Sequence, residues 1–329
     1  MTSKKNRLAF LGSDEIALPI LRFLNSTSST VDVAAILTQP DRRSGRGGKK
    51  SPNEIKKWAD ENSIPCESPE KPSIDECEWL KAKNVDILLV MAYGHILKRE
   101  FLDLAPRGCY NLHASILPKY RGASPIETAI AMGEKETGVT LMKVIPRMDA
   151  GPIIDIEQVE ITDSESGPSL RSKISEACVP VVSRNLDQIL HGTIQELTQN
   201  ESLATYCRKL CKDDANLDFN LSAEQLVNRI RAFVSWPGAN FLFESQKIRI
   251  GEAEYCNNHL SLSPGETIME SNNKFCIGTS DGLLIPKTLQ RPGGKMLKTE
   301  DFFRGFEFPF GCRLNSFPSH PLLKSKLLE

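Results

Sequence analysis

The sequence has almost no net charge. Its 329 residues include 41 lysines and arginines and 42 aspartates and glutamates, which gives a formal charge of −1 at pH 7. Since proteins that bind nucleic acid usually carry a basic surface, any contact with RNA would have to come from a local patch. No apolar stretch approaches the length needed to span a bilayer, and the apolar run after the N-terminal MTSKKNR is too short for a signal peptide. We therefore expect a cytoplasmic protein without membrane contact.

The sequence also lacks paired cysteines. Its nine cysteines are scattered, none forms a C-x-x-C pair, and neither His191 nor His259 lies near such a pair. Structural zinc requires clustered ligands, so we expect no metal. Scattered thiols of this kind are typical of reduced, cytosolic proteins.

The first part of the chain alternates between strand and helix patterns. Apolar, β-branched runs at 8–11, 31–37 and 85–92 indicate buried strands, and an amphipathic helix is expected at 73–83. The first strand-to-helix turn, LGSDEIA, lacks the G-x-G-x-x-G pattern of a dinucleotide site. This alternation predicts an α/β fold with a doubly wound, mostly parallel sheet.

The composition changes after Gly192. We expect one long helix over 169–190 that ends at this glycine, followed by a polar stretch. Beyond it, short strand-like runs separated by proline and glycine suggest a small β-barrel or sandwich; these runs are 239–243, 248–250, 260–262, 275–278 and 283–287. We predict an N-terminal domain at 1–192, a linker at 193–205 and a C-terminal β domain at 206–329.

Three polar residues lie at or near the ends of strand-like runs, where an open α/β sheet places its chemistry. Asn111 and His113 are separated by one residue, so on a strand both side chains point to the same side. Asp149 falls in the connection between two further predicted strands, 139–144 and 153–161.

These residue types suit acyl transfer to an amine. The Asn111 amide can stabilise a carbonyl oxygen that gains negative charge, and the His113 imidazole can move a proton at neutral pH. The Asp149 carboxylate can orient that imidazole or hold a water. Cys109 lies close by, but a buried strand cysteine is the more common case, so we expect direct transfer without a covalent enzyme intermediate. An Asn-x-His pair at a strand end is more often structural, and spacing alone does not decide between the two interpretations.

Several longer motifs carry a resemblance that does decide between them. They are FLGSDEIALPIL, TQPDRRSGRG, VMAYGHIL, GCYNLHASILPKYRGASPI, GVTLMKVIPRMDAGPI, LSAEQLVNRIRAFVSWPGA and GGKMLKTEDFFRGF. Their sequences and order resemble those of the methionyl-tRNA formyltransferases, a family of 10-formyltetrahydrofolate-dependent formyltransferases. The resemblance covers almost the whole chain and is weakest in its last third.

This resemblance implies an activity and a set of site residues. The implied reaction transfers the formyl group of 10-formyltetrahydrofolate, a co-substrate, to the α-amine of methionine on initiator methionyl-tRNA. By position, the residues matching the family's catalytic trio are Asn111, His113 and Asp149. The folate-binding element is matched by Ser115, Ile116, Leu117 and Pro118, and 91–94 would line the pterin pocket. The C-terminal domain would be a barrel of oligonucleotide-binding type that contacts the tRNA.

A basic, glycine-rich loop follows the predicted strand at 31–37 and precedes a helix that we expect to be capped at Ser51, with Pro52 in its first turn. Residues 42–50 contain five cations and no acid. Such a loop is usually only solvated, but the family uses its matching loop for tRNA, mostly through phosphates. The residues implied to bind tRNA are Arg42, Arg46, Lys49 and Lys50. The loop departs from the family pattern, because Arg43 replaces the usual proline and the loop is about two residues shorter.

Two rival interpretations remain at this stage. The same folate site could serve another acceptor, such as an amino-sugar nucleotide or water in a formyl hydrolase. Alternatively, the chain could be an RNA-binding module without activity. The basic loop and the β domain favour tRNA as the acceptor, and the intact polar trio favours an enzyme. No heptad or large apolar stripe stands out, so we expect a monomer.

Overall fold

The computed structural model describes residues 5–26, 30–44, 48–257, 259–271 and 273–325. Internal contacts group the chain into two compact units. The first unit comprises Met1–Arg121, Glu136–Glu160 and Arg171–Thr205, and the second comprises Gly122–Lys135, Ile161–Leu170 and Tyr206–Glu329. The division into domains at 1–192 and 206–329 with a linker at 193–205 stays a prediction.

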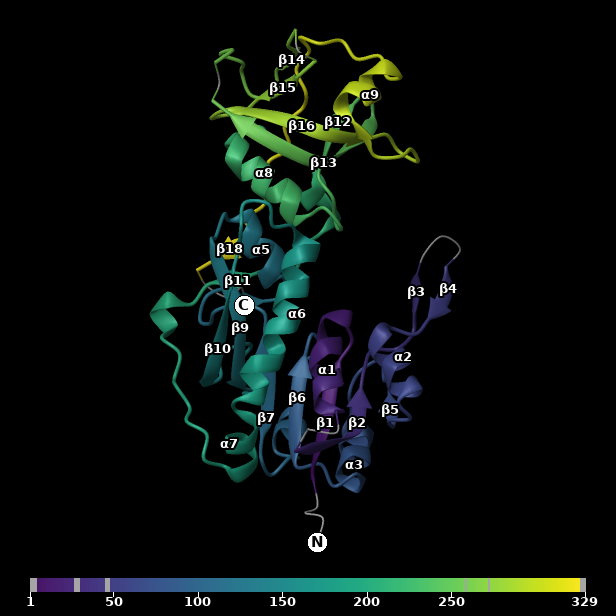
Figure 1. The fold of residues 1–329 in the computed structure, drawn as a ribbon, viewed down its shortest axis with the longest axis vertical. Coiled ribbons are helices and arrows are strands. Elements are labelled where there is room, and N and C mark those ends of the chain that lie inside the picture. The colour runs from purple at the N-terminus through teal and green to yellow at the C-terminus, as the bar shows by residue number, and fades with distance from the viewer. Residues whose placement is uncertain (1–4, 27–29, 45–47, 258, 272, 326–329) are drawn as a thin grey trace. The chain divides into compact units, whose positions relative to one another are not determined.

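A seven-stranded sheet forms the centre of the first unit, in the order β10-β9-β7-β6-β1-β2-β5 (Figure 1). Neighbours among β5, β2, β1, β6 and β7 pair in parallel, whereas β9 is antiparallel to both β7 and β10. The predicted doubly wound, mostly parallel sheet is therefore confirmed. The strands span Asn6–Gly12 (β1), Val31–Leu37 (β2), Cys66–Glu67 (β5), Ile87–Met91 (β6), Cys109–His113 (β7), Glu136–Lys143 (β9) and Ile153–Glu160 (β10).

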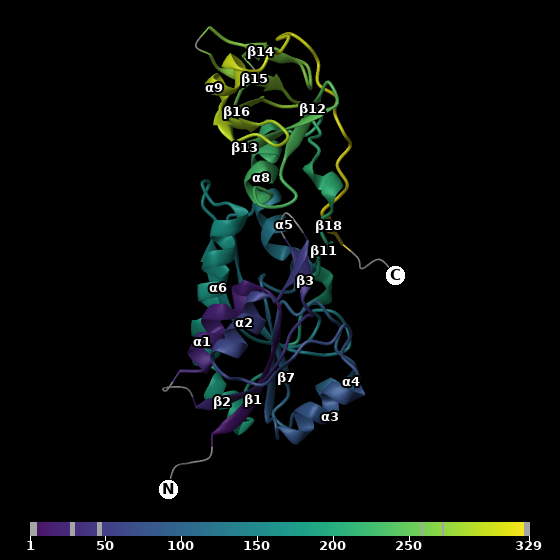
Figure 2. The same cartoon turned by 90° about the vertical axis from the view of Figure 1, so that its right-hand side faces the viewer.

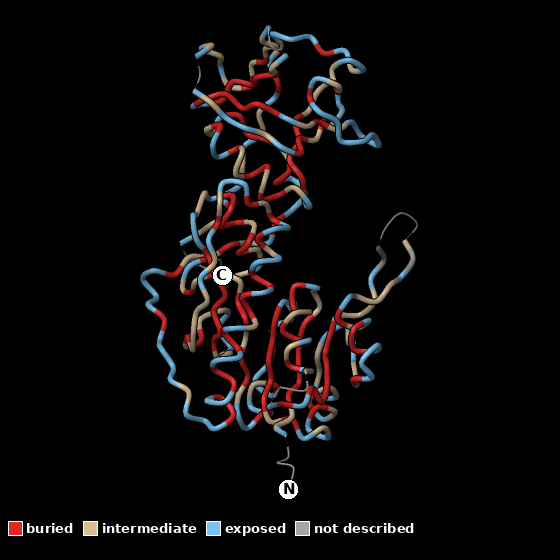
Figure 3. The backbone as a smooth tube through the Cα atoms, in the orientation of Figure 1, coloured by how far each residue is buried: buried red, intermediate tan, exposed pale blue. Residues whose placement is uncertain are grey.

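Helices cover both faces of this sheet. Figure 2 shows α1, α2 and α6 on one side and α3 and α4 on the other. Because both faces are covered, the central strands are apolar at nearly every position, and they appear as continuous buried segments in Figure 3. The helices of this unit are η1 (Glu15–Ala17), α1 (Leu18–Leu24), α2 (Glu54–Glu61), α3 (Ile74–Ala82), α4 (Arg99–Leu102), α6 (Gly167–Ser183, whose first turn belongs to the second unit) and α7 (Leu186–His191).

The single long helix predicted over 169–190 is wrong, because the chain forms α6 and α7 with a break between them. At the break, the Asn185 side-chain amide donates to the carbonyl of Val181 at 2.8 Å and to the Asp155 carboxylate of β10 at 2.6 Å. These bonds satisfy the last turn of α6 and turn the chain. Gly192, with φ of 70°, ends α7 as predicted.

An antiparallel sheet forms the core of the second unit, in the order β12-β13-β16-β15-β14, with β17 paired to β16. Register shifts in β13 lie on either side of Glu252, and such bulges bend and twist a strand, which gives the sheet its curl. The predicted C-terminal β domain is confirmed as a curled, half-barrel sheet. Its strands span Asn240–Phe243 (β12), Gln246–Cys256 (β13), Thr267–Met269 (β14), Phe275–Gly278 (β15), Leu283–Gln290 (β16) and Leu297–Lys298 (β17).

Two details of this unit differ from the sequence prediction. Residues 260–262 are not a strand, because this stretch forms part of the connection between β13 and β14. The helix α8 (Ala223–Ala232) was not predicted; its buried Leu226 and Ile230 pack into a core with Phe241 and Phe275. Apart from β3 and β4, described below, the remaining elements of the two units are β8 (Arg121–Gly122), α5 (Pro125–Ala131), η2 (Glu201–Leu203), β11 (Tyr206–Cys207), η3 (Lys212–Ala215), α9 (Thr299–Arg304) and β18 (Leu323–Lys324).

No helix among the described residues has both the length and the apolar character that crossing a membrane requires.

The packing of β6 predicts which substitution weakens the first unit. Leu88 is fully buried in the core between β1 and α3, so Leu88→Ala should lower the free energy of unfolding by about 2–5 kcal/mol. Urea denaturation can be followed by tryptophan fluorescence in a Trp236→Phe background, because Trp58 and Trp79 then report only on this unit. As a control, Asp32→Asn on the exposed side of β2 should change the free energy of unfolding by less than about 1 kcal/mol. Equal effects of the two substitutions would contradict this account of the core.

Candidate active site

Strand β7 presents two polar side chains on one side of the sheet. Asn111 and His113 are two positions apart on this strand, and β9 pairs alongside them at Met142 and Thr140. His113 is 7% exposed, and Asn111 is half-buried. The predicted placement of both residues at the carboxyl end of an inner strand is therefore observed.

Asp149 lies beside this pair, on the loop between β9 and β10. Its Oδ2 is 3.7 Å from Nδ1 of His113, longer than a direct N–H···O hydrogen bond. Asp149 has a φ of 48°, in the left-handed region that residues other than glycine seldom adopt, although aspartate and asparagine enter it more readily than most. The structure thus brings together all three residues of the predicted trio.

The other nitrogen of His113 fixes the state of the ring. Nε2 lies 2.9 Å from the backbone carbonyl oxygen of Tyr120. A carbonyl can only accept a hydrogen bond, so Nε2 carries a proton and Nδ1 is the nitrogen that faces Asp149. This leaves Nδ1 to gain or lose a proton at the same place where the carboxylate can stabilise the charged ring.

The predicted folate-binding element is a tight loop after β7, and Thr140 of β9 holds it. The Thr140 hydroxyl donates to the carbonyl of Ser115 at 2.6 Å and accepts from the backbone N–H of Leu117 at 3.1 Å. Ser115 is fully buried and its hydroxyl donates to the carbonyl of Lys119 at 2.7 Å, while Leu117 packs into the protein interior. Among the four predicted positions, only the side chains of Ile116 and Pro118 are partly exposed.

The turn after β6 lies at the same edge of the sheet and has a fixed backbone. The carbonyl of Ala92 accepts from the Ser13 hydroxyl at 2.8 Å, and the carbonyl of Tyr93 accepts from the Gln39 amide at 2.9 Å. Gly94 has a φ of 77°, and a Cβ there would lie 2.5 Å from Nε2 of Gln39. This turn therefore requires glycine.

The predicted basic loop forms a short β-hairpin, with β3 (Arg42–Ser44) antiparallel to β4 (Lys49–Ser51) (Figure 1). Arg42 is exposed and pairs with Glu70 at 3.1 Å, and Lys50 is exposed. Arg46 lies outside the described residues, and for Lys49 only the backbone is described. The helix after the hairpin is capped by Asn53, whose side chain accepts from the N–H of Lys56, and not by Ser51 as the sequence suggested.

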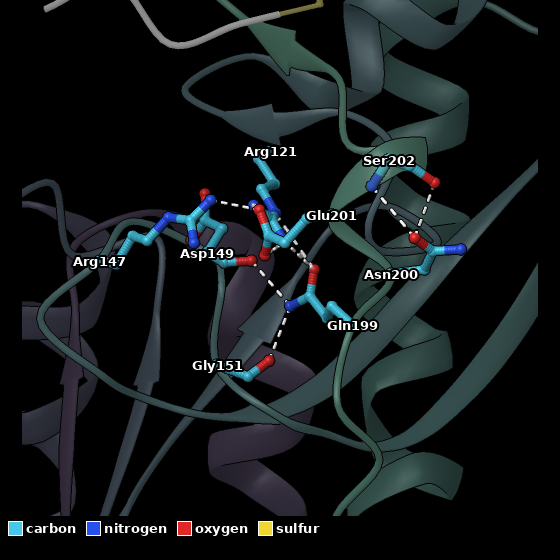
Figure 4. Close-up of polar contacts among 8 residues, drawn as sticks. All are labelled: Arg121, Arg147, Asp149, Gly151, Gln199, Asn200, Glu201 and Ser202. Atoms are coloured by element: carbon cyan, nitrogen blue, oxygen red, sulfur yellow. Dashed lines mark hydrogen bonds and ion pairs between the residues drawn. The ribbon is translucent and has the colours of Figure 1, made fainter.

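Sequence reasoning missed a polar group beside the Asp149 loop, in which the buried side chains of Arg121 and Gln199 meet the exposed side chain of Glu201 (Figure 4). Gln199 donates to the carbonyl oxygens of Asp149 and Gly151. These residues are separated from Asp149 by about 30 to 50 positions in the chain, so no local pattern connects them. The one available signal was the arginine next to Gly122 in the motif KYRGASPI.

Cys109 is an unsuitable nucleophile. It is buried in β7, and burial raises the pKa of its thiol to about 12. The group is therefore a protonated thiol at neutral pH. Among the described residues, no three His, Cys, Asp or Glu side chains come together as a metal site would require.

Comparison with known proteins identifies the family. Residues 6–186 match the formyl transferase family, and residues 209–307 match the formyl transferase C-terminal domain. The chain is 35% identical over 310 residues to a methionyl-tRNA formyltransferase of Sulfurihydrogenibium sp., covering 93% of this chain and 99% of that protein. It is 37% identical over 309 residues to that of Thermotoga neapolitana, covering 94% and 98%.

The chain belongs to the methionyl-tRNA formyltransferase family. Solved structures agree with this at the level of the fold. An N-formyltransferase from Helicobacter canadensis, in complex with folinic acid and dTDP-3-aminofucose, has a TM-score of 0.65 at 20% identity, with 87% of this chain and 100% of that chain covered. HypX from Aquifex aeolicus in complex with tetrahydrofolic acid has a TM-score of 0.58 at 16% identity, with 92% and 47% covered.

The role of Thr140 predicts a large effect from an isosteric change. Thr140→Val removes the hydroxyl that satisfies Ser115 and Leu117, and each buried backbone group left without a partner costs about 1–3 kcal/mol. The free energy of unfolding, measured by urea denaturation, should fall by at least about 2 kcal/mol. Thr140→Ser keeps the hydroxyl and loses one methyl group, so it should cost only about 1 kcal/mol. Equal losses in the two variants would show that removing the hydroxyl costs no more than removing a methyl group, which would contradict this account.

Proposed function

We propose that this protein transfers the formyl group of 10-formyltetrahydrofolate to the α-amine of methionine on initiator methionyl-tRNA. The observation that carries the proposal is the meeting of Asn111, His113 and Asp149 at one sheet edge, in a chain similar over almost its whole length to methionyl-tRNA formyltransferases. The proposal includes a monomeric, cytoplasmic protein that uses no metal.

In the proposed reaction, the methionyl amine attacks the formyl carbon and forms the new C–N bond. The formyl oxygen becomes an oxyanion, and the Asn111 amide is placed on the same side of β7 as His113 to hydrogen-bond it. The bond from the formyl carbon to N10 then breaks, the attacking amine loses one proton, and N10 gains one. The reaction therefore requires a group that moves a proton between two nitrogens.

His113 and Asp149 are arranged for this proton transfer. Since Nε2 of His113 is bonded to Tyr120, the proton exchanged with the reactants is the one on Nδ1. A protonated Nδ1 can donate to the oxyanion, while Asp149, at 3.7 Å, stabilises the charged ring and leaves room for a water or a substrate nitrogen. Asp149 thus helps move the proton toward N10.

The folate donor would bind beside the trio. Ile116 and Pro118, the partly exposed members of the element 115–118, would contact it through their side chains, with Ser115 and Leu117 holding the loop from inside. Residues Met91–Gly94 would face the pterin. The folinic acid and tetrahydrofolic acid named in the two structures of similar fold support this choice of donor.

For the tRNA, the hairpin supplies the local basic patch that the neutral net charge of the chain requires. We assign Arg42, Arg46, Lys49 and Lys50 to phosphate contacts. Residues 206–329 would form the second tRNA-contacting surface, and residues 1–192 would form the catalytic domain.

The choice of acceptor can be tested in a single-turnover assay with 10-formyltetrahydrofolate. Methionyl initiator tRNA, amino-sugar nucleotides and water alone are offered in parallel. We expect formylation of the tRNA only. Formylation of a sugar, as the dTDP-3-aminofucose of the Helicobacter canadensis structure would suggest, or hydrolysis alone would refute the acceptor and keep the donor. If neither acceptor is formylated and no donor is hydrolysed, the result would favour a binding protein without activity.

Substitution of the trio tests the roles given above. His113→Ala and Asp149→Ala should each lower kcat by about 10²–10⁴-fold, the usual contribution of general acid–base catalysis. Circular dichroism should show an unchanged fold, because His113 is the last residue of β7 and Asp149 lies on a loop. Turnover close to wild type in either variant would refute the assignment of that residue.

The hairpin can be tested by the salt dependence of tRNA binding. Arg42→Ala with Lys50→Ala should weaken binding and reduce the slope of log K against log salt by about 0.9 for each phosphate that the variant no longer neutralises. Lys57→Ala, which removes an exposed cation of α2 paired with Glu54, is the matched control and should leave the slope unchanged. An unchanged slope in the hairpin variant would show that these cations do not bind the tRNA.

A further inference from the structure

The segment after α7 runs back to the active-site loop. Leu197 exchanges backbone hydrogen bonds with Ile153 of β10, both at 2.8 Å. Two residues later, Gln199 is 6% exposed and lies between Arg121 and the loop that carries Asp149 (Figure 4). Most side chains of this segment are exposed, but those of Gln199 and Ala204 are buried in the first unit.

Arg121 is the fixed point of the group. Its side chain is fully buried, Nε and Nη2 donate to Oε1 of Gln199 at 3.1 and 2.7 Å, and Nη1 and Nη2 donate to the two carboxylate oxygens of Glu201 at 3.1 and 2.9 Å. The hydrogen bond from Arg121 lowers the pKa of the Glu201 carboxyl, which keeps it ionised at neutral pH. A buried guanidinium needs hydrogen-bond acceptors around it. The guanidinium of Arg121 therefore fixes the position of the Gln199 side chain.

The Gln199 amide connects Arg121 to the Asp149 loop through hydrogen bonds on its two sides. Its carbonyl oxygen is taken by Arg121, so its amino group must point the other way, where it donates to the carbonyl oxygens of Asp149 at 2.9 Å and Gly151 at 2.7 Å. Both donors of the amide are used. Glu201 adds a second tie through its ion pair with Arg147 of the same loop.

The backbone of this loop adopts a constrained conformation at Asp149 and Gly151. Asp149 adopts a left-handed backbone conformation, which an aspartate does not prefer. Gly151 packs so closely on β9 that a Cβ there would lie 1.8 Å from the carbonyl oxygen of Lys143. The backbone is therefore constrained at Asp149 and at Gly151, and the Gln199 amide donates to the carbonyl oxygen of each.

We propose that Gln199, oriented by Arg121 and Glu201, is a positioning residue that holds the Asp149 carboxylate opposite Nδ1 of His113. The inference rests on the proposed function for its kinetic consequence, and its structural consequence can be measured without that function. It assigns to the segment 199–201 a role in catalysis without contact to either substrate.

Two substitutions separate positioning from simple support of the buried arginine. Gln199→Glu keeps an acceptor for Arg121, beside which the new carboxylate stays ionised, but replaces the amino donor by an oxygen that repels the carbonyls of Asp149 and Gly151. Gln199→Met removes both functions at similar volume. If Gln199 positions Asp149, both variants should lose at least about tenfold in kcat, with the KM for each substrate within about threefold, because small misplacements at a reacting centre cost up to about 10²-fold.

Ser202→Ala is the matched control on the same segment. Among the residues that the structure describes, its hydroxyl donates to Asn200 alone, at 2.8 Å, away from the Asp149 loop (Figure 4). This variant should keep the kcat of the wild-type protein. If Ser202→Ala loses as much activity as Gln199→Glu, or if Gln199→Glu keeps wild-type kcat, the proposal is overturned.

A second measurement tests the positioning role without requiring enzyme activity. The nitrogen-15 signals of the His113 ring, recorded at one pH in folded protein, report the charge beside Nδ1. In Gln199→Glu they should move from the wild-type position toward that of Asp149→Asn, and Ser202→Ala should leave them in place. Inactivity of the wild-type protein toward methionyl-tRNA would refute the proposed function alone, whereas unmoved His113 signals in Gln199→Glu would overturn the positioning role. Should Gln199→Met fail to fold, Gln199→Glu carries both measurements.

Discussion

The hydrogen bond from His113 to the carbonyl oxygen of Tyr120 determines how the rest of the site is arranged. It assigns the proton to Nε2, and so it turns Nδ1 toward Asp149. Tyr120 can hold its carbonyl there only because the loop before it is tied down. Thr140 binds that loop from β9, and Thr205 binds Tyr120 through its hydroxyl, which accepts from the Tyr120 N–H at 2.9 Å. The tautomer of the His113 ring therefore depends on two threonines, Thr140 and Thr205, that lie far from it in the sequence.

The parts of the structure that follow from local pattern could be predicted from the sequence. The strands of the parallel sheet are continuous apolar runs because both of their faces are buried, and the positions of Asn111 and His113 follow directly from the alternation of side chains along β7. Membership of the methionyl-tRNA formyltransferase family followed from motifs such as NLHASILP and is confirmed by the near full-length similarity to its members.

The parts that depend on contacts between distant segments could not be predicted. The break between α6 and α7 depends on Asp155, a residue of another strand that binds Arg184 and Asn185. The approach of Gln199 to Asp149 depends on a fully buried arginine some eighty positions earlier in the chain, and arginine is among the residues least expected in an interior. The polar composition of 193–205 predicts an exposed connection. It does not show which polar side chains of the stretch form hydrogen bonds with distant residues.

The path of this stretch limits how the chain can be divided. Thr205, its last residue, accepts at its carbonyl from the backbone N–H of Arg121 at 2.9 Å and donates its own N–H to Pro118 at 3.3 Å, so the catalytic loop and the end of the segment share one set of backbone bonds. A protease cut, an inserted tag or a fusion junction is ordinarily placed in such a connection because it is assumed to carry no structure. In this protein the same intervention would disturb the backbone hydrogen bonds that hold residues 118–121, which include the Tyr120 carbonyl bound by His113. A fragment that keeps these bonds must extend at least through Thr205, and it also contains residues 122–135 and 161–170, which belong to the second unit.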